Sequence, residues 1–161
     1  MQTMKFSERY GLVRAVEDLI KRQTRRIMEP QPAGRLVELY DDTGTTCARF
    51  SCGVELRARY KVGEVVEIPR TDGGDTLRVR ITEVWCMRMK DITDRDCIAE
   101  GVQVLDDFFY FIDHRTDQVH KYPTPRKAFQ GLIGCIYDPD TWRRNPWVWA
   151  YEFKKENKQQ L

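Results

Sequence analysis

The chain has 161 residues, enough for one well-cored domain and too few for two. Lysine and arginine total 27 and aspartate and glutamate total 25, so the formal net charge is +2. This balance excludes a histone-like polycation, whose affinity for nucleic acid rests on many phosphate contacts. With 41% hydrophobic and 11% aromatic residues the chain can fill a core, which excludes wholesale disorder.

The apolar runs of the sequence are a few residues long, far below the roughly 18 needed to span a bilayer. Residues 1–6 lead into charged sequence without the apolar core of a signal peptide. We therefore expect a soluble, cytoplasmic protein with no membrane partner. It should fold as a single domain over residues 1–155, followed by a polar tail over residues 156–161.

The cysteines form no zinc-binding pattern. There are five of them, an odd number with no C-x-x-C spacing: Cys47, Cys52, Cys86, Cys97 and Cys135. The two histidines, His114 and His120, lie far along the chain from Cys47 and Cys52. Buried or half-buried thiols in a reducing compartment are the interpretation we prefer to a structural metal, and we expect no cofactor. Two histidines also leave little room for a Ser-His-Asp or Cys-His mechanism, so a catalytic base would be Lys, Asp or Glu.

The first part of the chain predicts one helix and little else. Ser7 is a candidate N-cap, and apolar residues at helical spacing behind it predict a helix over about 8–21. A basic segment follows over residues 21–27. Proline, glycine, aspartate and threonine cluster over 29–46, which predicts a long surface loop with one short strand over 36–40.

The middle of the chain is predicted to be rich in β-structure. A strand over 62–68 and a long return strand over 77–90 enclose a turn over 71–75. On the long strand apolar and polar residues alternate, and Glu83 falls in the apolar phase. A β-bulge explains this better than a buried working carboxylate, although both interpretations remain open.

The last third of the chain predicts two helices and a closing strand. Residues 93–96 resemble a capping box with Gly101 as terminator, and Thr124 caps a helix over 124–137. Aromatic and smaller residues alternate as a strand over 147–153. Because strands outnumber helices and are joined by hairpin turns, we predict an α+β fold. It is a small, mostly antiparallel barrel of five to seven strands with about three helices.

The basic segment 21–26 carries the strongest chemical signal. It holds four cations in six residues, together with Gln23 and Thr24. One interpretation is a solvated basic face, and a second is contact with phosphate or nucleic acid. A third is that the neighbouring arginines lower the pKa of Lys21, so that it can take the proton of the Thr24 hydroxyl.

A second signal is aromatic. Trp142, Trp147 and Trp149 lie close together near the C-terminus, with Asn145 and Pro146 between them. Alternating tryptophans on a strand are typical of a core. A nucleobase site needs the same flat apolar surfaces, together with an amide that reads the base edge.

Four stretches of the sequence resemble the ASCH family, a branch of the PUA-like β-barrels common in bacteria and their phages. They are residues 21–27, 60–66, 78–82 leading to 91–101, and 142–153, and their order and spacing match the family from about residue 4 to residue 155. This chain departs from the family in two respects. The family often has glycine and threonine where Leu19 and Arg22 stand, and the segment 103–121 is longer than in compact members.

The resemblance implies a PUA-like fold and one of two functions. PUA-like barrels commonly bind RNA, so a non-catalytic RNA- or nucleotide-binding module is one expectation. Some small ASCH proteins are amidohydrolases that remove the acyl group from N4-acetylcytidine and related N4-acylated cytosines. Their lysine, threonine and glutamate correspond to Lys21, Thr24 and Glu100 here. We expect this hydrolase function, with a small-molecule substrate and a monomeric protein.

The implied chemistry assigns further roles. Lys21 would take the proton of Thr24, which attacks the acyl carbon or positions a water that does so. Backbone N–H groups or Gln23 would hold the oxyanion. The remaining expected substrate contacts are to the base: Arg25 or Arg26 at the carbonyl at position 2, Asn145 at the base edge, and an aromatic stack from Trp142, Trp147 or the 108–111 cluster.

Overall fold

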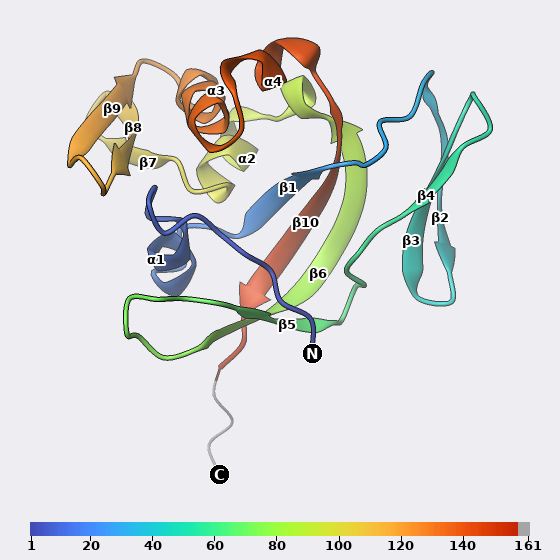
Figure 1. Ribbon diagram of the computed structural model, residues 1–161, viewed down its shortest axis with the longest axis horizontal. Helices are drawn as coiled ribbons and strands as arrows, with labels where there is room; N and C mark the ends of the chain where they lie inside the picture. The colour runs from blue at the N-terminus through green and yellow to red at the C-terminus, as the bar shows by residue number, and fades with distance from the viewer. Residues whose placement is uncertain (158–161) are drawn as a thin grey trace.

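A four-stranded antiparallel sheet forms the centre of the computed structural model, which describes residues 1–157 (Figure 1). Its strands lie in the order β1, β10, β6 and β5. Their bounds are β1 Gln23–Ile27, β10 Trp147–Lys155, β6 Leu77–Arg88 and β5 Val65–Ile68. Strand β10 therefore lies between β1, which is part of the basic segment 21–27, and the long strand β6.

Two three-stranded antiparallel sheets and four α-helices complete the described part of the chain. The sheets are β2 (Leu36–Asp42) with β3 (Thr45–Phe50) and β4 (Glu55–Arg57), and β7 (Gln103–Leu105) with β8 (Phe108–Asp113) and β9 (Gln118–Tyr122). The helices are α1 (Leu12–Glu17), α2 (Asp94–Ala99), α3 (Pro125–Ile136) and α4 (Pro139–Arg144), with a 3-10 turn at Met89–Asp91. Figure 1 shows the first small sheet at one side of the central sheet and the second beside α3.

The fold is thus α+β with mostly antiparallel sheets. Four predicted elements are confirmed: the long strand, the closing strand paired against it, and the helices that begin after Thr93 and Thr124. Hydrogen bonding among residues 1–157 divides ten strands into three sheets and closes no barrel. The expectation of five to seven strands was wrong.

The β-bulge predicted at Glu83 is present. Glu152 of β10 pairs with Glu83, but Phe153 pairs with Ile81, so Thr82 has no opposite residue. The extra residue reverses the faces of the strand beyond it, because side chains alternate with a period of two. Val84 and Cys86 are therefore the buried residues there, and Glu83 itself is exposed. The two phases of the sequence pattern therefore exchange faces beyond the bulge.

The first helix is shorter than predicted. It begins after Gly11 (φ 72°), and Ser7 accepts a hydrogen bond from the Tyr10 amide in the turn before the helix. The helix ends before Leu19, whose φ of 62° is left-handed. Left-handed backbone at both ends restricts the helix to six residues, although apolar spacing continues on either side.

Several segments have structure that the sequence did not predict, strands β1 and β4 among them. Strand β3 pairs with β2 through a two-residue turn at Thr43 and Gly44, both with positive φ, inside the predicted loop 29–46. The segment 103–121 contains the β7–β9 sheet, and Asp138 caps the unpredicted helix α4. Strand β10 ends at Lys155, directly before the predicted tail, and the Glu156 amide donates to the carbonyl of Arg78 at 2.8 Å. Residues 158–161 of that tail lie outside the described residues.

The core lies on both faces of the central sheet. One buried cluster joins β5, β6 and β10 to Phe50 of β3, and a second packs α2 and α3 against Val148 of β10. The second cluster holds the C-terminal end of α2 next to β1. None of the helices within residues 1–157 combines the length and apolar character needed to cross a membrane.

Candidate active site

The entry to β1 is held against the end of α2 by the backbone. The Ile20 and Lys21 amides both donate to the carbonyl of Ala15 in α1, at 2.9 and 3.0 Å. The Arg22 amide donates to the carbonyl of Ala99 at 2.7 Å. Because Ala99 is the last residue of α2, this contact places Lys21 beside the next residue, Glu100.

Lys21 is buried, with 3% of its surface exposed, and three oxygens surround its ammonium group. Its Nζ donates to the main-chain oxygen of Gln23 at 2.8 Å. It also donates to the main-chain oxygen and to Oε1 of Glu100, at 2.7 and 3.1 Å. These acceptors occupy all three hydrogens of a lysine ammonium, which is how a buried charge is stabilised.

The Glu100 carboxylate lies between two cations. One oxygen accepts from Lys21, and the other accepts from Nη1 of Arg25 at 2.9 Å. Arg25 is itself buried and donates through Nη2 to Asp96 at 3.2 Å. Lys21, Arg25 and Glu100 thus form a buried ion network in which no cation lacks a carboxylate partner.

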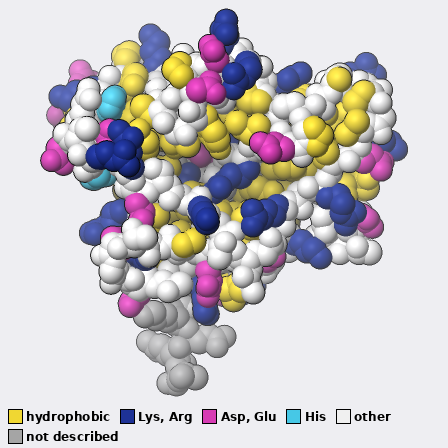
Figure 2. All heavy atoms as spheres, viewed as in Figure 1, with side chains coloured by type: hydrophobic (Ala, Val, Ile, Leu, Met, Phe, Trp, Pro, Cys, Tyr) yellow, Lys and Arg dark blue, Asp and Glu magenta, His cyan; other side chains and the backbone are white. Residues whose placement is uncertain are grey.

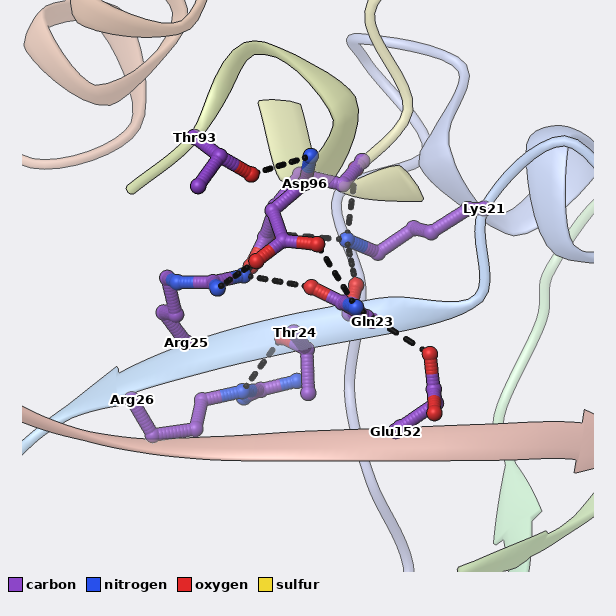
Figure 3. A network of polar contacts seen from close by, with 9 residues as sticks. Lys21, Gln23, Thr24, Arg25, Arg26, Thr93, Asp96 and Glu152 are labelled. Atoms are coloured by element: carbon purple, nitrogen blue, oxygen red, sulfur yellow. Dashed lines mark hydrogen bonds and ion pairs between the residues drawn. The ribbon is translucent and has the colours of Figure 1, made fainter. Parts of the chain in front are cut away.

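Gln23 connects this network to β10 (Figure 3). Its Nε2 donates to Asp96 of α2 and to Glu152 of β10, both at 3.1 Å, and its Oε1 accepts from Arg25 at 2.9 Å. Both amide hydrogens are therefore occupied, since a glutamine amide has only two. In this conformation Gln23 cannot act as the oxyanion donor that the sequence suggested.

Thr24 and Arg26 point to the other side of β1, as alternation along a strand requires (Figure 3). Arg26 Nε donates to Thr24 Oγ1 at 3.1 Å, and Arg26 Nη2 donates to the main-chain oxygen of Lys5 at 2.6 Å. The Phe6 ring centroid is 5.0 Å from Lys21 Nζ and 5.1 Å from the Arg26 guanidinium carbon. Phe6 therefore contacts both Lys21 and Arg26.

Lys21, Thr24 and Glu100 line one cavity of about 80 Å³ between β1 and α3. Its apolar side is formed by five residues: Leu12, Phe129, Leu132, Ile133 and Ile136. Its other lining residues are Lys5, Phe6, Ser7, Arg25, Arg26 and Tyr137. On the face seen in Figure 2, lysine and arginine side chains lie in a hollow below a band of hydrophobic side chains. No hydrogen bond joins Lys21 to the Thr24 hydroxyl within the described residues.

Burial lowers the pKa of Lys21, and this effect outweighs the opposing influence of Glu100, which raises it. The positive charges of Arg26 and Arg25 lower it further. Desolvation and like charge both disfavour the ammonium form, so Lys21 releases its proton at a lower pH than an exposed lysine does. A lysine with these properties is suited to proton transfer.

The other predicted substrate-binding residues lie outside this cavity. Trp142 packs edge-to-face on Phe129, with the Arg126 guanidinium over its ring. Asn145 adopts a left-handed conformation at the end of α4, and its Oδ1 accepts from the Lys90 amide at 2.8 Å. Each of these contacts is structural.

Trp147 is also placed in the core. Its ring lies 5.0 Å from Phe50, centroid to centroid, and under the Arg88 guanidinium at 4.6 Å. Phe108 and Tyr110 of the 108–111 cluster pack on each other in the β7–β9 sheet, and neither lines the cavity. The structure therefore brings together Lys21, Thr24, Glu100 and the two arginines, and leaves the proposed aromatic stack elsewhere.

Sequence reasoning gave nine of the fourteen lining residues no role in a site, among them Lys5, Phe6 and Tyr137. Tyr137 has a sequence signal, because it continues the i, i+4 row of Phe129 and Ile133 along the inner face of α3. Phe6 and Lys5 have none, since they belong to an irregular segment that the fold lays across β1.

The described residues include no group of three or more His, Cys, Asp or Glu side chains that could hold a metal ion. Burial raises the pKa of Cys86 to about 11 and that of Cys97 to about 12, so both thiols stay protonated.

No protein-family model, curated protein or solved structure matches this chain.

Proposed function

We propose that this protein is an amidohydrolase that removes the acyl group from N4-acylated cytosine or cytidine. The observation that carries the proposal is that Lys21 and Thr24, at the start of β1, and Glu100, at the end of α2, line one cavity. Lys21 is buried there and paired with Glu100, and its pKa is lowered. A hydroxyl beside a lysine of lowered pKa is a recurrent arrangement for nucleophilic catalysis.

The resemblance to the ASCH family supports the same function. Its four stretches correspond to β1, the segment entering β5, β6 with α2, and α4 with β10. The resemblance therefore falls on the central sheet and on the helix that carries Glu100. We propose on this basis that the α+β domain is of the PUA-like type.

The departure from the family at Leu19 has a backbone explanation. Leu19 has a φ of 62°, in the left-handed region that glycine adopts without steric cost. A glycine two residues before the lysine, as the family often has, suits this conformation. This agreement between the family pattern and the local backbone is a further support for the proposal.

The reaction we propose begins with the Thr24 hydroxyl. Neutral Lys21 takes its proton while Thr24 Oγ1 forms a bond to the acyl carbon. The bond between that carbon and N4 then breaks, and the departing N4 takes the proton from Lys21. Water hydrolyses the resulting ester, which releases the carboxylic acid and restores Thr24. The pyrimidine ring assists because it stabilises the departing amine.

The Arg26 contact favours Thr24 as the nucleophile over Thr24 as a residue that positions water. A guanidinium donating to Oγ1 at 3.1 Å stabilises negative charge developing on that oxygen. It leaves the hydroxyl hydrogen available, and that hydrogen has no acceptor within residues 1–157. Lys21 must approach Thr24 for the transfer, and catalytic hydrogen bonds often tighten only when substrate binds.

The deciding experiment incubates the purified protein with N4-acetylcytidine and follows release of cytidine and acetate. Turnover should be abolished by Lys21→Met and retained by Lys61→Met, a matched change at an exposed lysine. Absence of turnover, combined with salt-sensitive RNA binding by the same protein, would support the non-catalytic binding module instead.

A further inference from the structure

The candidate cavity has two chemically different ends. Its closed end is lined by buried apolar side chains: Leu12 (6% exposed), Phe129 (1%), Leu132 (1%) and Ile133 (4%). Its mouth is lined by exposed or half-buried residues: Lys5, Ser7, Arg26 and Tyr137. Half-buried Ile136 stands between Ile133 and Tyr137 along the chain. Lys21, Thr24 and Glu100 form the polar wall between them.

We infer that the closed end is an acyl-binding subsite that admits short acyl groups and excludes long or aromatic ones, while the cytosine stays at the mouth. This inference rests on the proposed amidohydrolase function and names the substrate class it would accept. The cavity volume of about 80 Å³ is the first support. Sites that enclose a whole small molecule measure roughly 300–1,000 Å³, so this cavity can enclose only part of a nucleoside.

The direction of binding follows from polarity. A cytosine in the closed end would place its ring nitrogen and carbonyl against Leu12, Phe129, Leu132 and Ile133, none of which can hydrogen-bond to it. Burying polar groups without partners is unfavourable, whereas the hydrocarbon part of an acyl group gains by leaving water. The acyl group therefore belongs inside, with its carbonyl carbon at the wall that carries Thr24.

The mouth offers what a base needs. Tyr137 is 43% exposed there and presents an aromatic ring. Arg26 lies in the same mouth, and its Nη1 has no acceptor among the described residues. A ring for stacking and a guanidinium for a carbonyl oxygen are the contacts by which proteins hold an unstacked base.

Ile136 marks the limit between the two ends. It is half-buried and follows Leu132 and Ile133 on the inner face of α3. Shortening it lengthens the apolar end without touching the polar wall. A matched control is Leu105→Ala, because Leu105 is 51% exposed on β7 and does not line the cavity.

The test measures kcat/KM for N4-acetyl-, propionyl-, butyryl-, hexanoyl- and benzoylcytidine. We expect the wild type to prefer the acetyl and propionyl substrates, with kcat/KM at least about tenfold lower for hexanoyl- and benzoylcytidine. A few additional methylenes in a tight apolar pocket lower kcat/KM by this much or more. Ile136→Ala should raise kcat/KM for hexanoylcytidine at least tenfold relative to kcat/KM for acetylcytidine. Leu105→Ala should leave this ratio unchanged. Ile136→Val, a milder change, should give a smaller shift in the same direction.

The possible failures are distinguishable. Hydrolysis of acetylcytidine with no preference along the series would overturn the acyl subsite and leave the hydrolase intact. The same conclusion would follow if both Ile136 variants fold, by thermal unfolding, and keep the wild-type ratio. Hydrolysis of none of the five substrates would overturn the proposed function itself.

Discussion

Lys21 contacts Glu100 twice, through the side-chain Oε1 at 3.1 Å and through the main-chain oxygen at 2.7 Å, across 79 positions of sequence. Glu100 is the C-cap of α2, so the ammonium also satisfies a carbonyl at the end of that helix, where a positive charge is favourable. One residue thus holds the lysine in place with its backbone and tunes it with its side chain. These two roles can be separated by substitution.

Glu100→Gln should shift the pH dependence of kcat to lower pH. The change keeps the main-chain contact but removes the negative charge, which is what raises the pKa of Lys21 against burial. With that charge gone, the pKa falls further, so the neutral base persists at lower pH. A kcat profile on N4-acetylcytidine tests this, with Asp94→Asn on the exposed side of α2 as control. An unmoved acidic limb would show that Lys21 is not the titrating base.

Thr24→Val should lower kcat at least about a hundredfold, because it removes the hydroxyl from a buried site and keeps its shape. Thr24→Ser should retain part of the activity. Rapid quenching followed by mass spectrometry should detect an acyl group on wild-type Thr24. Full activity in Thr24→Val would assign the attack to water and leave Thr24 without a chemical role.

Arg25→Ala and Arg26→Ala should fail in different ways. Arg25 is buried against Glu100 and Asp96, so its loss should lower the free energy of unfolding by about 3–5 kcal/mol. It should also lower activity on every substrate. Arg26 donates to Thr24 Oγ1, so its loss should lower activity on a simple anilide as well as on acylated cytidine. It is also half-buried at the cavity mouth, so the loss on acylated cytidine should be the larger one. Thermal melts and rates on both substrates separate the two. Equal losses on both substrates for Arg26→Ala would remove it from base recognition.

Leu19→Gly should stabilise the protein by about 0.5–1 kcal/mol. Leu19 is 65% exposed, so its side chain contributes little packing, while its left-handed backbone costs roughly 1–2 kcal/mol. The greater chain entropy of glycine offsets part of that gain. Urea unfolding gives the difference directly. A loss of stability would mean that the Leu19 side chain contributes more packing energy than its exposed fraction indicates.

Asp113 should contribute to stability in a pH-dependent manner. Hydrogen bonds from Arg9 at 2.7 and 2.9 Å hold the pKa of this carboxyl well below its usual range. A lowered folded-state pKa stabilises the protein above the unfolded value of roughly 4, and the benefit disappears as the pH falls towards the folded value. The stability difference between wild type and Asp113→Asn should be constant near neutral pH and shrink below about pH 4. A difference that is constant down to pH 2 would contradict the ion pair.

Local sequence signals were enough for the long strand, the closing strand and the helices after Thr93 and Thr124. Each has regular apolar spacing together with a cap or turn at its end. The same signals failed for α1, where backbone conformation at Gly11 and Leu19 overrides the apolar spacing. Local signals also failed for β3, because its turn at 43–44 lies within the stretch 29–46, whose composition predicts a loop.

The sequence by itself was enough to select Lys21, Thr24 and Glu100 as candidate residues, through the resemblance of its motifs to the ASCH family. Only the tertiary structure decided that Arg25 and Gln23 turn towards Asp96 while Arg26 turns towards Thr24. The sequence of a basic segment does not show which of its cations will be buried, because that depends on where carboxylates lie in the fold. Here the carboxylates are Asp96 and Glu100, at α2, far along the chain. Burying a charge is favourable only where such partners meet it, and that meeting is a property of the packed fold.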